Sequence, residues 1–180
     1  MLEDKLLMWK LKHGNRDALR LLYEKYKDNL RTIASSMLHD THAAEDVLHD
    51  VFVMFAENAR SLQVRTSLKS YLATCVVNRA RDEFRHRKRR MSELGKAGAI
   101  SSNINSPESH IVENEMSQIL TNALAAIPLE QREVIMLHIK GELKFREIAR
   151  MQQTSVSTVH GRYRYGLKKL NTILDGELEK

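Results

Sequence analysis

The sequence has few of the residues that interrupt helices or cross-link chains. Its 180 residues include two prolines, seven glycines and one cysteine, Cys75. A single cysteine excludes an intrachain disulfide and a cysteine-based metal site. Because helix breakers are so rare, we predict an all-α protein.

Long hydrophobic runs are missing as well. No apolar stretch approaches the roughly 20 residues that a bilayer-spanning helix needs. The first residues, Met1 to Leu11, include Glu3, Asp4 and Lys5 and do not follow the charged-then-apolar pattern of an export signal. Hydrophobic residues make up 42% of the chain and charged residues 29%, so we expect a soluble, cytoplasmic protein with a folded core.

Positive charge is concentrated in two parts of the chain. Residues 61–90 hold nine Lys or Arg against two Asp or Glu, and residues 141–180 hold eight against five. The rest of the chain is slightly acidic. Because phosphate neutralisation dominates nucleic-acid binding, two basic blocks predict two contact points on a nucleic acid. The alternative interpretation is a solvated cationic face.

Apolar residues recur at helical spacing through the first half of the chain. They predict helices over about residues 1–13, 16–38, 43–58 and 67–90. Asn15 is a candidate N-cap for the second of these helices, and Asp40 or Thr41 for the third. Short connections between amphipathic helices favour an antiparallel bundle, so residues 1–90 are predicted to form a first domain.

Residues 91–109 differ from their surroundings. They are small, polar and aperiodic and include Pro107, which indicates a flexible linker. Residues 110–180 are predicted to form a second helical domain. Within it, Pro128 suits the start of a helix and Gly141 its end.

A helix-turn-helix is predicted near the C-terminus. A short helix, Phe145 to Met151, is followed by a brief turn and a long cationic helix that Ser155 can cap. In this motif the second helix enters the major groove, and its capped start directs N–H groups at phosphate. The candidate DNA contacts are Ser155, Ser157, Thr158, His160, Arg162, Arg164 and Lys168. A plain helical hairpin within a bundle is the alternative.

Both domains resemble parts of bacterial RNA polymerase sigma factors. The C-terminal landmarks are Leu124, Pro128, Arg132-Glu133-Val134, Leu137, Glu147-Ile148-Ala149, Ser155, Thr158-Val159 and Leu170. In the first domain, Ala44-Glu45-Asp46 with Asp50-Val51-Phe52 resembles the helix that such factors dock on polymerase. Tyr71-Leu72 through Asn78 and Asp82 to Arg90 resembles their helix for the upstream promoter element. Two such domains and a linker resemble the small extracytoplasmic-function (ECF) class.

The resemblance implies a fold, a function and a set of site residues. The fold is a sigma domain two-like bundle and a helix-turn-helix sigma domain four joined by a flexible linker. The function is that of a transcription initiation factor, which binds core RNA polymerase, directs it to promoter DNA and promotes strand opening. Many members of the family are held by an anti-sigma protein.

The site residues that the resemblance implies fall into two groups. Polymerase contacts are expected at Asp46, His49, Asp50 and Val53. First-domain DNA contacts are expected at Ser61, Arg65, Asn78, Arg79, Arg81, Arg85, Arg87 and Lys88. The loop from Ser61 to Thr66 is expected at a flipped-out base. No catalytic residue, metal or cofactor is expected.

Some residues depart from the usual pattern of the family. Tyr71 stands where tryptophan is common, His49 where glutamine is usual and Val77 where a basic residue is common. The turn at residues 151–154 lacks the frequent glycine. Conversely, two glycines lie inside the recognition helix, where each costs roughly 1 kcal/mol relative to alanine; they are Gly161 and Gly166.

Two further side chains have structural interpretations. Asp82 lies among the cations and is expected to pair with Arg79 or Arg85 at i, i+3 spacing. Tyr71 is interpreted as a core residue in preference to a platform for stacked bases.

Two other functions remain open on the residues alone. One is a helix-turn-helix regulator that binds duplex DNA without polymerase. The other is a metal-dependent hydrolase built on His39, His42, Glu45, Asp46 and His49, which would need further ligands from other helices. No Ser/His/Asp catalytic pattern, glycine-rich phosphate loop or paired-carboxylate site is visible elsewhere in the sequence. We therefore expect that the protein is not an enzyme.

Overall fold

The computed structural model describes residues 2–64, 67–95 and 115–178. Within these residues the chain forms helices and no strands, which confirms the all-α prediction. The helices are α1 (Leu2–Lys12), α2 (Arg16–Leu38), α3 (Thr41–Asn58), α4 (Leu68–Gly95), α5 (Glu115–Ala125), α6 (Leu129–Ile139), α7 (Phe145–Met151) and α8 (Val156–Leu178). None of them is long and apolar enough to cross a membrane.

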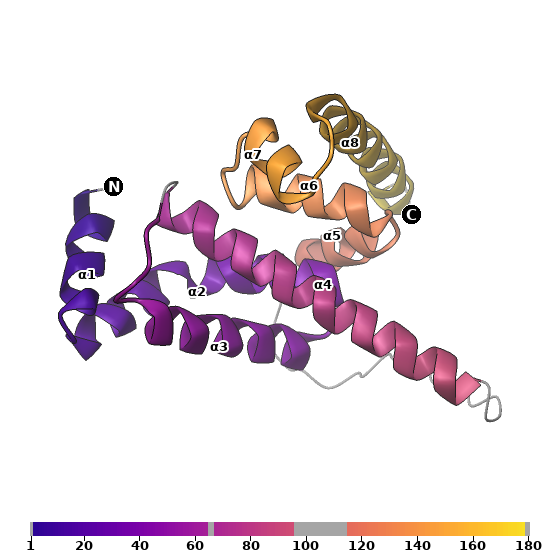
Figure 1. Cartoon of the computed structure of the whole chain (residues 1–180). Helices are drawn as coiled ribbons and strands as arrows, with labels where there is room; N and C mark the ends of the chain where they lie inside the picture. The colour runs from indigo at the N-terminus through magenta and orange to yellow at the C-terminus, as the bar shows by residue number, and fades with distance from the viewer. Residues whose placement is uncertain (1, 65–66, 96–114, 179–180) are drawn as a thin grey trace.

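Helices α1 to α4 form the first bundle (Figure 1). Local side-chain caps fix where its second and third helices begin. The Asn15 side chain accepts a hydrogen bond from the Ala18 N–H at 3.1 Å, and the Asp40 side chain accepts one from the Ala43 N–H at 3.0 Å. Asp40 is therefore the cap of α3, which begins at Thr41. Each cap satisfies a backbone donor that the helix itself leaves open.

Helix α4 is the longest element and crosses the whole first bundle (Figure 1). Ser67 precedes it, and its hydroxyl accepts a hydrogen bond from the Ser70 N–H at 3.0 Å. The helix continues to Gly95, so residues 91–95 are helical although the sequence analysis assigned them to the linker. The rest of the predicted linker, residues 96–109, lies outside the described residues, as does the start of the second domain up to residue 114.

Helices α5 to α8 form the second bundle. Ser155 accepts a hydrogen bond from the Thr158 N–H at 3.0 Å, which confirms the predicted cap of α8. In the preceding turn, Gln153 has φ of 52°, in the left-handed region. This is the turn whose usual glycine is missing, and glycine adopts that conformation without steric cost.

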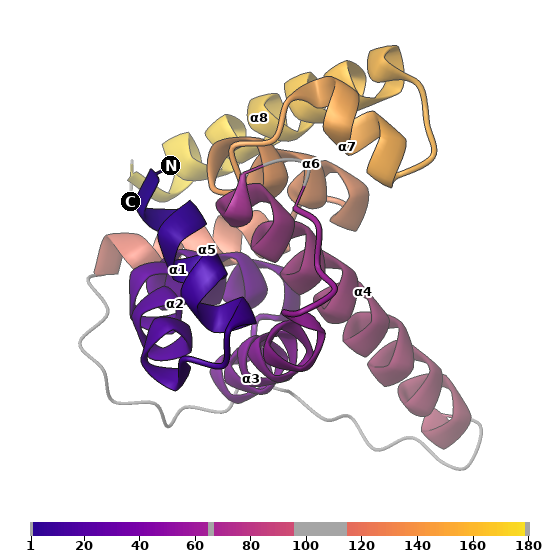
Figure 2. The ribbon, with the colours of Figure 1, turned by 60° about the vertical axis from the view of Figure 1, so that its left-hand side comes forward.

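The two bundles pack against each other. In Figures 1 and 2, α6, α7 and α8 lie above α4, while α5 lies beside α2. All side chains from Arg132 to Leu137 in α6 are buried, because α8 covers one side of this helix and α2 and α4 cover the other. The buried residues of both bundles therefore form one continuous cluster.

Candidate nucleic-acid and polymerase interface

The proposed DNA-facing part of α4 is a row of side chains at i, i+3 and i+4 spacing. Asn78, Arg81, Arg85 and Lys88 share this row. Asn78, Arg85 and Lys88 are exposed, whereas Arg81 is half-buried. The C-terminal part of α4 extends past the start of α3 (Figure 1).

Two of the predicted cations face the other side of α4 and hold it to α3. Both Nε and Nη2 of Arg79 donate to the same carboxylate oxygen of Asp50, at 3.0 and 2.8 Å. Arg87 donates to Asp40 at 2.8 Å and to Glu83 at 2.9 Å. The expected pairing of Asp82 with Arg79 or Arg85 is therefore wrong: Asp50 binds the Arg79 guanidinium, and among the described residues no ion pair joins Asp82 to Arg85.

Asp40 has two roles at this contact, as the cap of α3 and as a partner of Arg87. Partial burial acts to raise its pKa, but hydrogen bonds from the Ala43 N–H and from Arg87 lower the pKa below its usual value. The carboxylate thus stays charged and keeps the start of α3 attached to α4.

Arg81 is held by the second bundle. Its Nε donates to Glu133 Oε1 at 2.7 Å, and its Nη2 donates to Oε2 of the same side chain. Glu133 is 2% exposed, and its hydrogen bond raises the pKa of Arg81. Glu133 is not among the site residues expected from the sequence. The available signal was a glutamate that directly precedes the apolar run Val134 to Leu137, because a buried carboxylate needs a charged partner.

The loop expected at a flipped-out base lies beside a pocket. Ser61 is exposed, and its hydroxyl donates to the Asn58 carbonyl at 3.2 Å. Arg65 and Thr66 lie outside the described residues. A pocket of about 430 Å³ separates α1 from this loop and from the start of α4.

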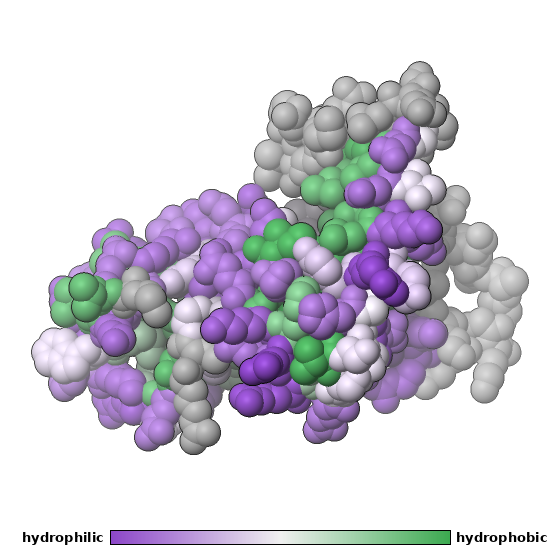
Figure 3. Space-filling view, turned by 90° about the horizontal axis from the view of Figure 1, so that it is seen from above, coloured by the Kyte–Doolittle hydropathy of each residue, from purple (hydrophilic) through white to green (hydrophobic). Residues whose placement is uncertain are grey.

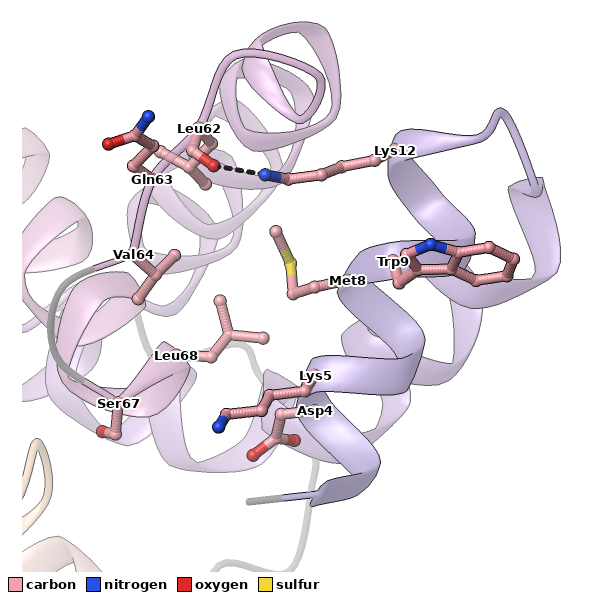
Figure 4. A pocket seen from close by; sticks show the side chains of 10 residues that line it. All are labelled: Asp4, Lys5, Met8, Trp9, Lys12, Leu62, Gln63, Val64, Ser67 and Leu68. Carbon is pink, nitrogen blue, oxygen red and sulfur yellow. Dashed lines mark hydrogen bonds between the residues drawn. The ribbon is translucent and has the colours of Figure 1, made fainter.

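Both α1 and the loop line this pocket (Figure 4). The Lys12 ammonium donates to the Leu62 carbonyl at 2.7 Å and ties the two walls together. Met8, Val64 and Leu68 make the interior apolar, and Trp9, 58% exposed, lies on α1 at its edge. Helix α1 holds none of the site residues expected from the sequence.

The start of α8 is open to solvent. Ser155, Ser157, Thr158, His160, Arg164 and Lys168 are all exposed. Arg162 differs, because its guanidinium donates to the Gln152 side chain at 2.7 Å and is half-buried. Arg164 lies over the exposed ring of Tyr165, 5.0 Å from its centroid.

The predicted polymerase contacts form one exposed face of α3. Asp46, His49, Asp50 and Val53 are all exposed. Asp46 and His49 line two polar hollows, one of about 710 Å³ against α2 and one of about 300 Å³ against α4. These two side chains therefore stand on a ridge between two depressions.

Two remaining interpretations concern metal binding and Tyr71. Among the described residues, no group of three or more His, Cys, Asp or Glu side chains is arranged to hold a metal ion. The half-buried Tyr71 ring lies 6.3 Å from that of Phe55, which supports the core interpretation.

On the face seen in Figure 3, hydrophilic side chains predominate and hydrophobic ones form small separate groups.

Comparison with known protein families gives two matches in the expected order. Residues 22–90 match sigma-70 region 2, and residues 117–170 match sigma-70 region 4. The ECF RNA polymerase sigma factor SigW of Bacillus subtilis (strain 168) is 26% identical over 175 residues, covering 89% of this chain and 90% of its own length. The ECF RNA polymerase sigma-E factor of Escherichia coli (strain K12) is 23% identical over 170 residues, covering 89% and 88%.

Solved structures share the fold over both bundles. The sigma factor RpoE from Bartonella quintana, in complex with the anti-sigma factor NepR, aligns with a TM-score of 0.68 at 21% identity and covers 87% of this chain and 96% of its own. CnrH, in complex with the cytosolic domain of CnrY, aligns with a TM-score of 0.65 at 23% identity and covers 97% and 98%.

Proposed function

Because this chain belongs to the ECF class of bacterial RNA polymerase sigma factors, and is a transcription initiation factor, we propose that three of its surfaces divide the work. The exposed face of α3 binds core polymerase, the α4 row opens promoter DNA, and the start of α8 recognises the upstream element. The observation that carries this assignment is that each surface presents exposed side chains among those expected to act there, on a separate helix: Asp46 on α3, Arg85 on α4 and Ser157 on α8.

Polymerase docking depends on the ridge of α3. Asp46 and Asp50 lie one turn apart and present two carboxylates on the same side, which suits basic side chains on a polymerase coiled coil. Arg79 already partly neutralises Asp50, so Asp46 contributes the larger share of the attraction. The hollows on either side of Asp46 and His49 give side chains of the partner room to enter.

Strand opening depends on α4 and on the loop before it. Arg85 and Lys88 neutralise the backbone of the unpaired strand, since phosphate contacts supply most of the affinity for nucleic acid. Asn78 offers an amide that reads the edges of an unstacked base. Arg79 and Arg87 act indirectly, because they hold α4 in place against α3.

Upstream recognition depends on the first turns of α8. Ser157 and His160 stand near the exposed helix start, where side chains reach base edges in the major groove. The open backbone N–H groups beside Ser155 and the cations Arg164 and Lys168 contact phosphates.

The proposed partners are core RNA polymerase, promoter DNA and an anti-sigma protein in the cytoplasm. The anti-sigma protein is inferred from two solved structures. RpoE was solved with an anti-sigma factor, and CnrH was solved with the cytosolic domain of CnrY. The deciding experiment is co-purification with core polymerase, followed by run-off transcription from genomic promoters. We expect a stable complex and discrete transcripts. A chain that binds duplex DNA but does not associate with core polymerase at low salt would instead be a helix-turn-helix regulator.

A further inference from the structure

Four rings from three helices pack together inside the second bundle. Phe145 is the first residue of α7, and its ring centroid lies 4.2 Å from that of His138 on α6. It also lies 4.3 and 5.1 Å from the ring centroids of His160 and Tyr163 on α8. These four residues are called the ring cluster below. Because α6, α7 and α8 all contact one another (Figure 2), the cluster lies where the three helices meet.

His160 is the one member of the ring cluster that is open to solvent. Its residue is exposed, whereas the other three are half-buried. Within the part of the chain that the structure describes, no hydrogen bond or ion pair engages the His160 ring. An exposed side chain ordinarily moves among several rotamers, but here the imidazole packs on Phe145 at an interplanar angle of 53°. The ring is therefore restrained while its nitrogens stay available.

Phe145 is itself held in place by its neighbours. The His138 ring stacks on it at an interplanar angle of 24°. The His138 Nδ1 donates to the Leu143 carbonyl at 2.8 Å, because a carbonyl can only accept a hydrogen bond. At the start of α7, the Lys144 backbone N–H donates to the Glu147 carboxylate at 2.7 Å. These contacts fix both the backbone and the ring of Phe145, so it is a rigid support for His160.

We propose that Phe145 is a positioning residue for upstream recognition. It holds the His160 ring in the orientation that reads one base pair, and His138 in turn holds Phe145. The inference rests on the proposed function, which assigns His160 to base edges in the major groove. Ordering a mobile side chain at an interface weakens binding by about twofold to tenfold, and a side chain that is already ordered avoids this loss. Phe145 thus sets specificity through His160.

A purely structural role for Phe145 predicts a different result. Loss of packing alone would disturb the whole start of α8 and weaken binding to every sequence. Loss of positioning lowers the preference at the base pair that His160 reads and leaves the other base pairs of the element unchanged. Lys168 gives the contrast, because loss of a phosphate contact weakens binding to all sequences alike.

The first test is a selection by the holoenzyme that the chain forms with core polymerase. The pool consists of promoter duplexes in which the upstream element found by run-off transcription is randomised. We expect His160→Ala to abolish the preference at one base pair. Phe145→Leu should lower the preference at the same base pair by about twofold to tenfold, and Phe145→Tyr, which keeps a ring, should restore it. Lys168→Ala should lower binding to the whole pool without changing the preferences.

The second test uses nuclear magnetic resonance of the full chain without DNA or polymerase. The Cε1–H signal of His160 is assigned by its loss in His160→Ala. We expect a nuclear Overhauser effect between this proton and the Phe145 ring in the unmodified chain, so this measurement holds even if Phe145→Leu does not fold. In Phe145→Leu the signal should move to the position of an exposed histidine. Trp9→Leu is the matched control, because Trp9 packs on His13 of α1 at the same 4.3 Å. It should shift the His13 signal and leave that of His160 unchanged.

The outcomes separate this proposal from the proposed function. Absence of the Overhauser effect in the unmodified chain would overturn positioning, whatever the chain does with polymerase. A uniform loss of binding in Phe145→Leu, with the preference at the His160 base pair retained, would show a structural role alone. If core polymerase does not bind, the proposed function fails, and the selection is repeated with the full chain alone on random-sequence duplexes. Loss of preference at one shared base pair in the His160 and Phe145 variants then supports positioning, and unchanged preferences in His160→Ala overturn it.

Discussion

Two glycines inside the recognition helix allow a sharp test of the packing of the second bundle. In an exposed helix interior, replacing glycine by alanine stabilises the helix by about 1 kcal/mol, because alanine loses less backbone entropy. At Gly161 an added Cβ would have no atom within 4 Å. We therefore expect Gly161→Ala to raise the free energy of unfolding by about 1 kcal/mol.

Gly166 should respond in the opposite direction. An added Cβ there would lie 2.9 Å from Ile135 Cδ1 and 3.1 Å from Gln131 Cβ, so the buried Ile135 side chain and α6 at Gln131 would have to shift. Overpacking of this kind costs about 1–3 kcal/mol. After the gain in helix propensity is subtracted, Gly166→Ala should change stability by between about zero and −2 kcal/mol.

The measurement is urea unfolding of both variants and the parent chain, followed by far-ultraviolet circular dichroism. The midpoint should rise for Gly161→Ala and stay level or fall for Gly166→Ala, with similar slopes. In thermal unfolding, 1 kcal/mol corresponds to about 2–4 °C for a chain of this size. Equal stabilisation by both substitutions would refute the close approach of α8 to α6 at Gly166.

Three further predictions concern the turn, pH and polymerase binding. Gln153→Gly removes a left-handed non-glycine residue and should stabilise the chain by about 1 kcal/mol in urea unfolding; Gln153→Ala, which keeps the strain, should not. Burial, the larger cause, and the charge of Arg132, the smaller one, lower the pKa of His39 from 6.5 to about 4. His39 directly precedes Asp40 in the sequence. Arg132 of the second bundle donates a hydrogen bond to the His39 ring at the end of α2, and this contact favours the neutral ring. The stability that this contact provides should be complete above pH 6.5 and fall as the pH drops from 6.5 towards 4. It should be seen as a falling midpoint in urea unfolding, and a midpoint that rises over this range would contradict the prediction. Asp46→Lys should weaken core polymerase binding in pull-downs by about tenfold while duplex binding by the chain is retained, and loss of both would show that the surfaces are not separate.

The sequence by itself determined the helices and the family. Helical periodicity and N-caps act over three or four residues, so Asn15 and Ser155 can be identified as N-caps without any tertiary contact. The order of motifs along α3, α4 and α8 likewise does not depend on how the bundles meet. The cap of α3 was ambiguous between Asp40 and Thr41, because the choice depends on backbone geometry at a single position.

Only the tertiary structure decided which charges are available for a partner. Arg79, Arg81, Arg85 and Arg87 look alike in the sequence, yet Arg79, Arg81 and Arg87 are each held by a carboxylate that lies 29, 52 and 47 residues away, respectively. Among the described residues, only Arg87 has a local partner as well, Glu83. Charge pairing at such separations depends on which helices pack together, and no local pattern records it. The same reason applies to Gly161 and Gly166, whose surroundings differ only because α6 packs against one of them.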